Sequence, residues 1–131
     1  MISTIVVNGQ NIDEEIGFKY VKAEYLVSTE RMEEAIKELN DIIKVSPIYK
    51  DALMLRAETR YKLGAFIGAK GDIMESISAI GITAKAAALL GKTEYALGNH
   101  DPALNSLTAA IALKVQDERL YEIRAAIYED K

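Results

Sequence analysis

The stretch that decides the fold lies at residues 32–43 and reads MEEAIKELNDII. Its apolar side chains recur at intervals of three and four residues, as Met32, Ala35, Ile36, Leu39, Ile42 and Ile43. Since an α-helix turns once in about 3.6 residues, this spacing gathers them on one face of a helix. The stretch therefore predicts an amphipathic helix that needs a second element to cover its apolar face.

The same pattern returns twice at a step of 34 residues. Residues 66–77 read FIGAKGDIMESI and residues 100–111 read HDPALNSLTAAI, which puts Ala35, Ala69 and Ala103 in phase. The step also links three other sets: Ile43, Ile77 and Ile111; Gly64 and Gly98; and the small residues Ala23, Ala57, Gly91 and Ala125. Agreement at several phases of one period indicates a repeat protein whose units stack on their neighbours.

The repeat resembles the tetratricopeptide repeat (TPR), a helix–turn–helix unit with the same period. Leu90-Gly91 matches the Leu-Gly pair of that family, and Gly64 and Gly98 match its turn. Pro47 stands eight residues after Leu39, as the proline of the family does.

The chain also departs from the family pattern. It has no Trp, and it carries Leu26, Arg60 and Glu94 where the family has Tyr. Gly81 and Val115 stand where later prolines would fall.

The resemblance implies an all-α fold, a right-handed solenoid of helical hairpins with seven helices. Residues 16–131 would form one domain, with repeats near 16–49, 50–83 and 84–117 and a capping helix near 118–130. We expect the first helix of each pair near 16–28, 50–63 and 84–97, where Ala23, Ala57 and Gly91 would let two helices approach closely.

The two ends of the chain carry separate expectations. In the capping helix we expect inward-facing side chains at Leu120, Tyr121, Ile123, Ala125 and Ile127. Residues 1–15 lie outside the repeat and are predicted to be a tail or an edge contact. Within them, Ile2 to Val7 has the composition of a short strand that precedes an Asn8-Gly9 turn.

Composition argues against several classes of partner. The net charge is −4, so the chain lacks the positive charge that attracts nucleic acid and anionic membrane surfaces. There is no Cys, which excludes disulfides and thiolate sites and agrees with a reducing compartment, so we predict a cytoplasmic protein. No apolar run has the length of a membrane span, and no basic leader opens the chain.

Residues that could support chemistry are scarce. His100 is the only histidine and falls at the phase of Met32 and Phe66, which predicts a packing role rather than a catalytic or metal-binding one. No phosphate-binding glycine loop is present. We therefore expect no enzyme activity, no catalytic residue, no cofactor and no metal.

A curved stack of helix pairs offers an extended groove lined by the first helix of each pair. In similar repeat proteins, the groove-facing positions are the exposed ones around the small packing residue. On this chain they are Tyr20, Glu24, Met54, Glu58, Tyr61, Lys85, Lys92 and Tyr95. We expect a protein or peptide to bind there, although exposed charges of this kind equally occur without any partner.

Some proteins of the family bind the C-terminal carboxylates of heat-shock chaperones through Lys, Asn and Arg residues in this groove. Here Tyr20 and Glu24 replace a Lys and an Asn, Leu55 replaces a second Asn, and Leu89 replaces the Arg. Lys85 alone agrees, which disfavours chaperone-tail binding.

Three functions remain open. The first is an adaptor or scaffold that holds a peptide or partner helix in the groove. The second is a self-associating structural module, a homodimer formed through Ile2 to Val7 or through the final helix. The third is a small secretion chaperone, since compact acidic proteins of three such repeats hold export substrates in the same groove.

Overall fold

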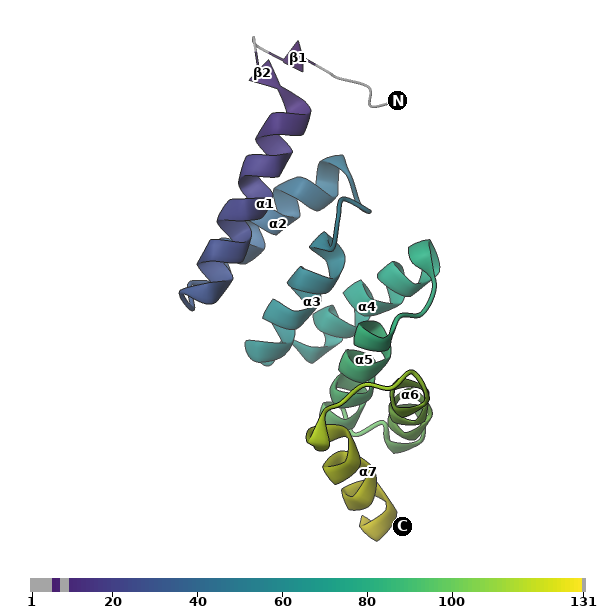
Figure 1. Cartoon of the computed structure of the whole chain (residues 1–131). Helices are drawn as coiled ribbons and strands as arrows, with labels where there is room; N and C mark the ends of the chain where they lie inside the picture. The colour runs from purple at the N-terminus through teal and green to yellow at the C-terminus, as the bar shows by residue number, and fades with distance from the viewer. Residues whose placement is uncertain (1–5, 8–9, 131) are drawn as a thin grey trace.

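The structure, a computed structural model, describes residues 6–7 and 10–130, with side chains from residue 12 onward. Seven helices make up almost all of this part of the chain (Figure 1). They are α1 (Ile12–Ser28), α2 (Met32–Val45), α3 (Ala52–Lys62), α4 (Phe66–Ile80), α5 (Ala84–Ala96), α6 (His100–Ala112) and α7 (Glu118–Asp130). The predictions of an all-α fold and of seven helices are confirmed.

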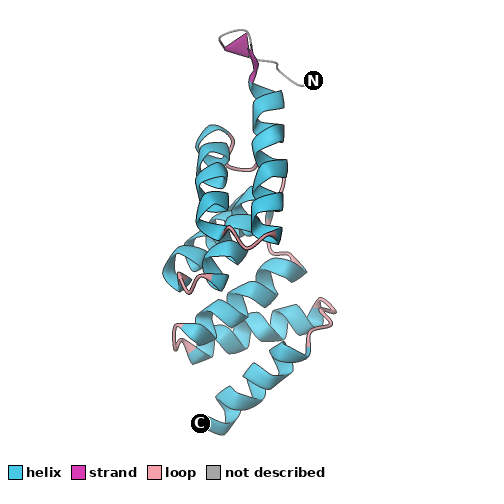
Figure 2. Ribbon diagram, turned by 90° about the vertical axis from the view of Figure 1, so that its left-hand side faces the viewer, coloured by secondary structure: helices cyan, strands magenta, loops and turns pink. Residues whose placement is uncertain are grey.

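The helices form pairs that stack along the chain. α1 packs with α2, α3 with α4, and α5 with α6, and each pair also contacts the next (Figure 2). The stack runs from α1 at one end to α7 at the other (Figure 1). α1 begins at Ile12 rather than near residue 16, because Asp13, Glu14 and Glu15 occupy its first turn, where carboxylates interact favourably with the helix dipole.

The repeated alanines lie at the centres of the pairs, as predicted. Ala35, Ala69 and Ala103 are fully buried, and so are the large residues four positions later, Leu39, Ile73 and Leu107. Ala23 and Ala57 on the first helices are fully buried as well. Small side chains at these points let the two helix axes approach, and the larger neighbours fill the space around them.

Gly91 marks a close approach between the paired helices α5 and α6. A Cβ atom at this position would lie 2.7 Å from Leu107 Cδ2 and 3.3 Å from the Leu107 backbone nitrogen. Leu107 is fully buried, so moving its side chain aside would disturb the core packing around it. The α5–α6 contact therefore favours glycine at this position.

One turn geometry joins the two helices of every pair. Glu30, Gly64 and Gly98 occupy the same phase of the repeat and have φ angles of 61°, 80° and 79°. After each of them a backbone N–H reaches back to the first helix, as in Ala65 N to Arg60 O at 2.8 Å and Asn99 N to Glu94 O at 2.9 Å. This is the Schellman type of helix end, which glycine adopts without strain.

The capping helix differs from the prediction at two positions. Leu120, Ile123 and Ile127 of α7 are buried, but Tyr121 is 49% exposed and Ala125 is exposed too. Ala125 has the same position in the repeat as Ala23, Ala57 and Gly91, which contact the second helix of each pair from α1, α3 and α5. No helix in the described part of the chain occupies that place beside α7, so only its other face is covered, by α5 and α6.

The N-terminal segment contains a small hairpin. β1 (Val6–Val7) pairs antiparallel with β2 (Gln10–Asn11), and β2 leads directly into α1. Val6 and Val7 thus lie in a strand, as predicted. The rest of the predicted strand, Ile2 to Ile5, and the Asn8-Gly9 turn lie outside the described residues.

Two helical glycines give opposite predictions for stability. Gly91→Ala should lower the free energy of unfolding by about 1–3 kcal/mol, because the new methyl group overlaps Leu107. Gly71→Ala should raise it by up to about 1 kcal/mol, since nothing lies within 4 Å of the new Cβ and alanine favours the helix. Urea denaturation of both variants measures the difference, and equal effects would contradict the close approach at Gly91.

Candidate functional site

The described surface has a hollow of about 560 Å³ on the face formed by the first helices of the second and third pairs. α3 and α5 provide most of its wall, and Val115 in the loop before α7 closes one end. The lining residues are Glu58, Tyr61, Lys62, Ala84, Lys85, Ala88, Leu89, Lys92 and Val115. Four of the eight predicted groove residues therefore meet in one hollow: Glu58, Tyr61, Lys85 and Lys92.

Lys85 joins two helices at the rim of this hollow. Its Nζ lies 2.9 Å from Glu58 Oε1 and 3.0 Å from Asp51 Oδ2, both of which belong to the preceding repeat. Burial alone would lower the pKa of Lys85, but the hydrogen bonds to Glu58 and Asp51 outweigh it and raise the pKa. The ammonium group is thus charged and neutralised by carboxylates of the protein itself.

Lys92 is held in a similar way one repeat further along. Its Nζ lies 2.6 Å from Asp117 Oδ2, in the loop that leads to α7. This hydrogen bond lowers the pKa of Asp117, with a further contribution from the Arg119 backbone N–H. The carboxylate therefore stays ionised to a lower pH than usual, and the bond to Lys92 weakens only as the pH falls through that lowered pKa.

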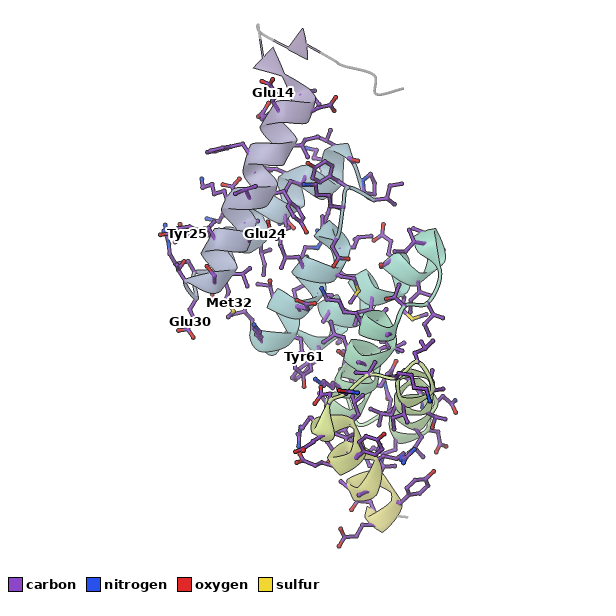
Figure 3. The ribbon with its side chains drawn as sticks, viewed as in Figure 1. Glu14, Glu24, Tyr25, Glu30, Met32 and Tyr61 are labelled. Carbon is purple, nitrogen blue, oxygen red and sulfur yellow. The ribbon has the colours of Figure 1, made fainter. Side chains whose placement is uncertain are left out.

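Between the two ion pairs the hollow is apolar. Ala84, Ala88 and Leu89 of α5 lie along its floor, with Val115 at one end and the Tyr61 ring at the other. Tyr61 is held by an edge-on contact with Phe66, with ring centroids 5.4 Å apart. Figure 3 shows Tyr61 at the C-terminal end of α3. Such a lining suits an apolar side chain better than a charged one.

The other predicted groove residues lie elsewhere. Glu24 is exposed on α1 (Figure 3), at a distance from the hollow along the stack. Tyr95 is half-buried and stacks on His100, with ring centroids 5.7 Å apart, so the only histidine has a packing contact.

The expectation that all eight residues are exposed is wrong for Tyr20 and Met54. Tyr20 is 8% exposed and packs edge-on against Tyr49, and Met54 is 2% exposed within the core between the second and third pairs. Both face the following repeat, and that packing, which a spacing rule does not contain, removes them from the surface.

Among the described residues, no group of three or more His, Cys, Asp or Glu side chains could hold a metal ion. None of the described helices has the length and apolar character needed to cross a bilayer.

A scan against protein-family models and a search of curated proteins found no match to the sequence. Solved structures do resemble it. The TPR domain of Arabidopsis OM64 gives a TM-score of 0.81 at 16% sequence identity, over 90% of this chain and 98% of that chain. The first TPR domain of Spaghetti (RPAP3), bound to the HSP90 peptide SRMEEVD, gives 0.79 at 18% identity, over 88% and 94%.

The chain has the tetratricopeptide-repeat fold. A tetratricopeptide repeat protein from Parabacteroides merdae resembles it as well, with a TM-score of 0.72 at 22% identity over 86% of this chain and 44% of that chain. Three helix pairs followed by α7 agree with three TPR units and a capping helix, as the sequence predicted.

This TPR fold contains a buried polar network that was not predicted from the sequence. Asp72 of α4 is 3% exposed and accepts hydrogen bonds from Arg56 at 3.0 and 2.7 Å and from Arg60 at 2.9 Å. Arg56 also donates to Asn40 Oδ1 of α2 at 2.9 Å, so the network links the first two pairs. Gly68 leaves room for it, since a Cβ there would lie 3.2 Å from Arg60 Cδ.

A second buried acid links the second and third pairs. Glu94 of α5 is 3% exposed, lies 3.0 Å from Lys70 Nζ of α4, and accepts a hydrogen bond from Asn99 at 2.7 Å. Arg60 and Glu94 occupy the phase where the TPR pattern has Tyr. Two charged residues at a position expected to be aromatic were the one signal in the sequence that could have revealed the network.

Removing the charge of Asp72 should destabilise the protein. In Asp72→Asn the amide keeps one acceptor but leaves two arginines without their carboxylate, and we expect a loss of about 2–3 kcal/mol in the free energy of unfolding. Glu34→Gln breaks the exposed Arg31–Glu34 pair and is the matched control, for which we expect no measurable change. Equal stability of Asp72→Asn and wild type would show that the network contributes nothing.

Proposed function

We propose that this domain is a non-enzymatic protein-interaction module that holds a peptide or partner helix in the hollow between α3 and α5. The observation that carries this proposal is the hollow itself, which is apolar, open and fixed between two rigid helices. A preformed site costs little conformational entropy when a ligand binds. The Spaghetti (RPAP3) domain with the same fold was solved with a peptide bound, which supports a peptide as the class of ligand.

The chemistry of the hollow favours a ligand with one bulky apolar side chain. The floor of Ala84, Ala88 and Leu89 would receive that side chain, and the Tyr61 ring offers a large rigid contact. Polar groups of the ligand backbone would lie near the rim, where Glu58 and Lys92 keep part of their side chains exposed.

An acidic tail is a poor ligand for this hollow. At Lys85 a ligand carboxylate would have to displace Asp51 and Glu58, and at Lys92 it would have to displace Asp117, which leaves the exposed Lys62 as the one lining lysine outside these ion pairs. The residues that would complete a carboxylate clamp in chaperone-binding proteins of this family are also replaced, by Glu24, Leu55 and Leu89. Chaperone-tail binding therefore remains disfavoured, and an adaptor, a scaffold or a secretion chaperone would each use the same apolar contact.

A peptide-display selection against the purified protein tests the proposal. We expect the enriched peptides to share a large aliphatic or aromatic anchor. Ala84→Trp should weaken their binding at least tenfold, because the indole ring fills the hollow. Lys37→Glu, at an exposed position on α2 outside the residues that line this hollow, is the control and should leave binding unchanged.

Exchanging the charges of Lys92 and Asp117 tests whether Lys92 contacts the ligand or only maintains an ion pair within the protein. Lys92→Glu should weaken peptide binding by repelling Asp117 and distorting the rim. The double variant Lys92→Glu with Asp117→Lys restores the ion pair with the charges exchanged. It should recover the binding of peptides that are held mainly by their apolar anchor. Wild-type affinity in Ala84→Trp, Lys92→Glu and Glu58→Lys alike would remove the hollow as the binding site.

A further inference from the structure

α1 carries an exposed apolar stripe at the first end of the stack. Phe18 is 70% exposed, Val21 is 61% exposed and Tyr25 is 59% exposed. Their spacing of three and four residues places all three on one side of the helix. Figure 3 shows Tyr25 on the outer side of α1, away from α3.

In α3, α5 and α7 the residues at the same three positions of the repeat are covered. One period later, Ala52 and Thr59 of α3 are fully buried and Leu55 is half-buried. In α5 the corresponding residues are Ala86, Leu89 and Thr93, and Leu89 alone among them is half-buried rather than buried. In α7 they are Leu120, Ile123 and Ile127, which are all buried. In these helices this side packs against the preceding pair.

The stripe therefore occupies the position of a repeat-to-repeat interface that no helix pair in the described part of the chain covers. Within residues 12–130 no helix packs on this side of α1, which lies at the end of the stack (Figure 1). Solenoids usually end in a polar face, because an apolar end continues to attract partners. Phe18, Val21 and Tyr25 make this end of the stack apolar instead of polar.

We propose that a second copy of this chain covers the stripe, with two α1 helices packed antiparallel across a two-fold axis. A stripe of this kind is complementary to itself, since apolar side chains of one copy meet those of the other, and the symmetry closes the assembly at two copies. The inference goes beyond peptide binding, and the hollow between α3 and α5 remains open in the dimer.

The charges beside the stripe agree with this packing. Glu15 and Lys22 flank it on the same side, and Lys22 keeps 47% of its side chain exposed while it pairs with Glu38 at 2.9 Å. In an antiparallel pair that crosses between Phe18 and Val21, Glu15 of each copy comes within reach of Lys22 of the other. Two opposite-charge contacts then border the apolar centre.

The other end of the stack is a poorer self-interface. α7 exposes Tyr121 and Tyr128 around Ala125, but Glu118, Glu122 and Glu129 flank them on one side. Two-fold pairing of α7 would bring these carboxylates together, which is unfavourable. Packing of α1 on α7 of another copy would be head-to-tail and would not close, giving chains of increasing length.

The size of the stripe predicts a weak dimer. Burying two aromatic rings and a valine from each copy removes on the order of 700 Å² from water in total, below the area of most stable interfaces. Association should therefore appear as protein concentration rises.

Sedimentation equilibrium from about 10 μM to about 1 mM tests the proposal, since small interfaces associate in this range. The mass should rise from 14.4 kDa toward twice that value, 28.8 kDa. Val21→Glu should hold it at the monomer value, while Met74→Glu, the same change at an exposed apolar position of α4, should not. Circular dichroism checks that both variants stay folded.

Four outcomes would overturn the proposal. The first three are a monomer at every concentration, a dimer that Val21→Glu leaves intact, and a dimer abolished by Tyr128→Glu instead. The fourth is growth beyond two copies, which would indicate head-to-tail packing.

A covalent test uses the absence of cysteine from the chain. Val21→Cys introduces one thiol near the two-fold axis, and mild oxidation by diamide should give a disulfide-linked dimer. The control Met74→Cys measures random collisions and should crosslink at least tenfold more slowly. Equal rates at the two positions would count against the α1 interface.

Discussion

The structure depends on the close approach of two helices at one point in each repeat. Ala23, Ala57 and Gly91 stand at this point on the first helices, and at Gly91 even a methyl group would overlap Leu107 of the partner helix. Where the helices meet this closely, the large residues on either side interdigitate and exclude water. Each pair is then a compact unit. Because the units have the same length and the same apolar positions, each one packs against the next and the pairs form a stack.

Stacking produces the hollow and also holds its shape. Lys85 reaches back to Asp51 and Glu58 of the preceding repeat, and Lys92 reaches forward to Asp117. These partly exposed pairs contribute little stability individually, but they fix the direction of the lysines and leave the apolar floor between them free. The charges of Glu58, Lys85 and Lys92 are therefore structural first, and under the proposed function selectivity for a partner would come from the shape and apolar character of the floor.

Two networks with a buried acid connect successive helix pairs. Glu94 of α5 pairs with Lys70 of α4. Asp72 of α4 binds Arg56 within its own pair, and Arg56 donates to Asn40 of the preceding pair. Each network includes a residue, Arg60 or Glu94, at the position where the repeat pattern has Tyr. The networks replace apolar packing with directional hydrogen bonds, which fix the alignment of the helices that they join. Within the described residues, no helix packs on the outer sides of α1 and α7. The molecule exposes Phe18, Val21 and Tyr25 at one end of the stack and Tyr121 and Tyr128 at the other.

The period of 34 residues was enough to predict the helices, their pairing, the buried alanines and the glycine turns, because these features depend on contacts that recur at fixed spacing. The tertiary structure alone decided which repeated positions stay at the surface. Tyr20 and Met54 are buried because the next repeat covers them, whereas Ala125 and Phe18 are exposed because no repeat within residues 12–130 lies beside them. The same phase can be core or surface according to what stacks upon it, and this depends on neighbours that a local pattern does not contain.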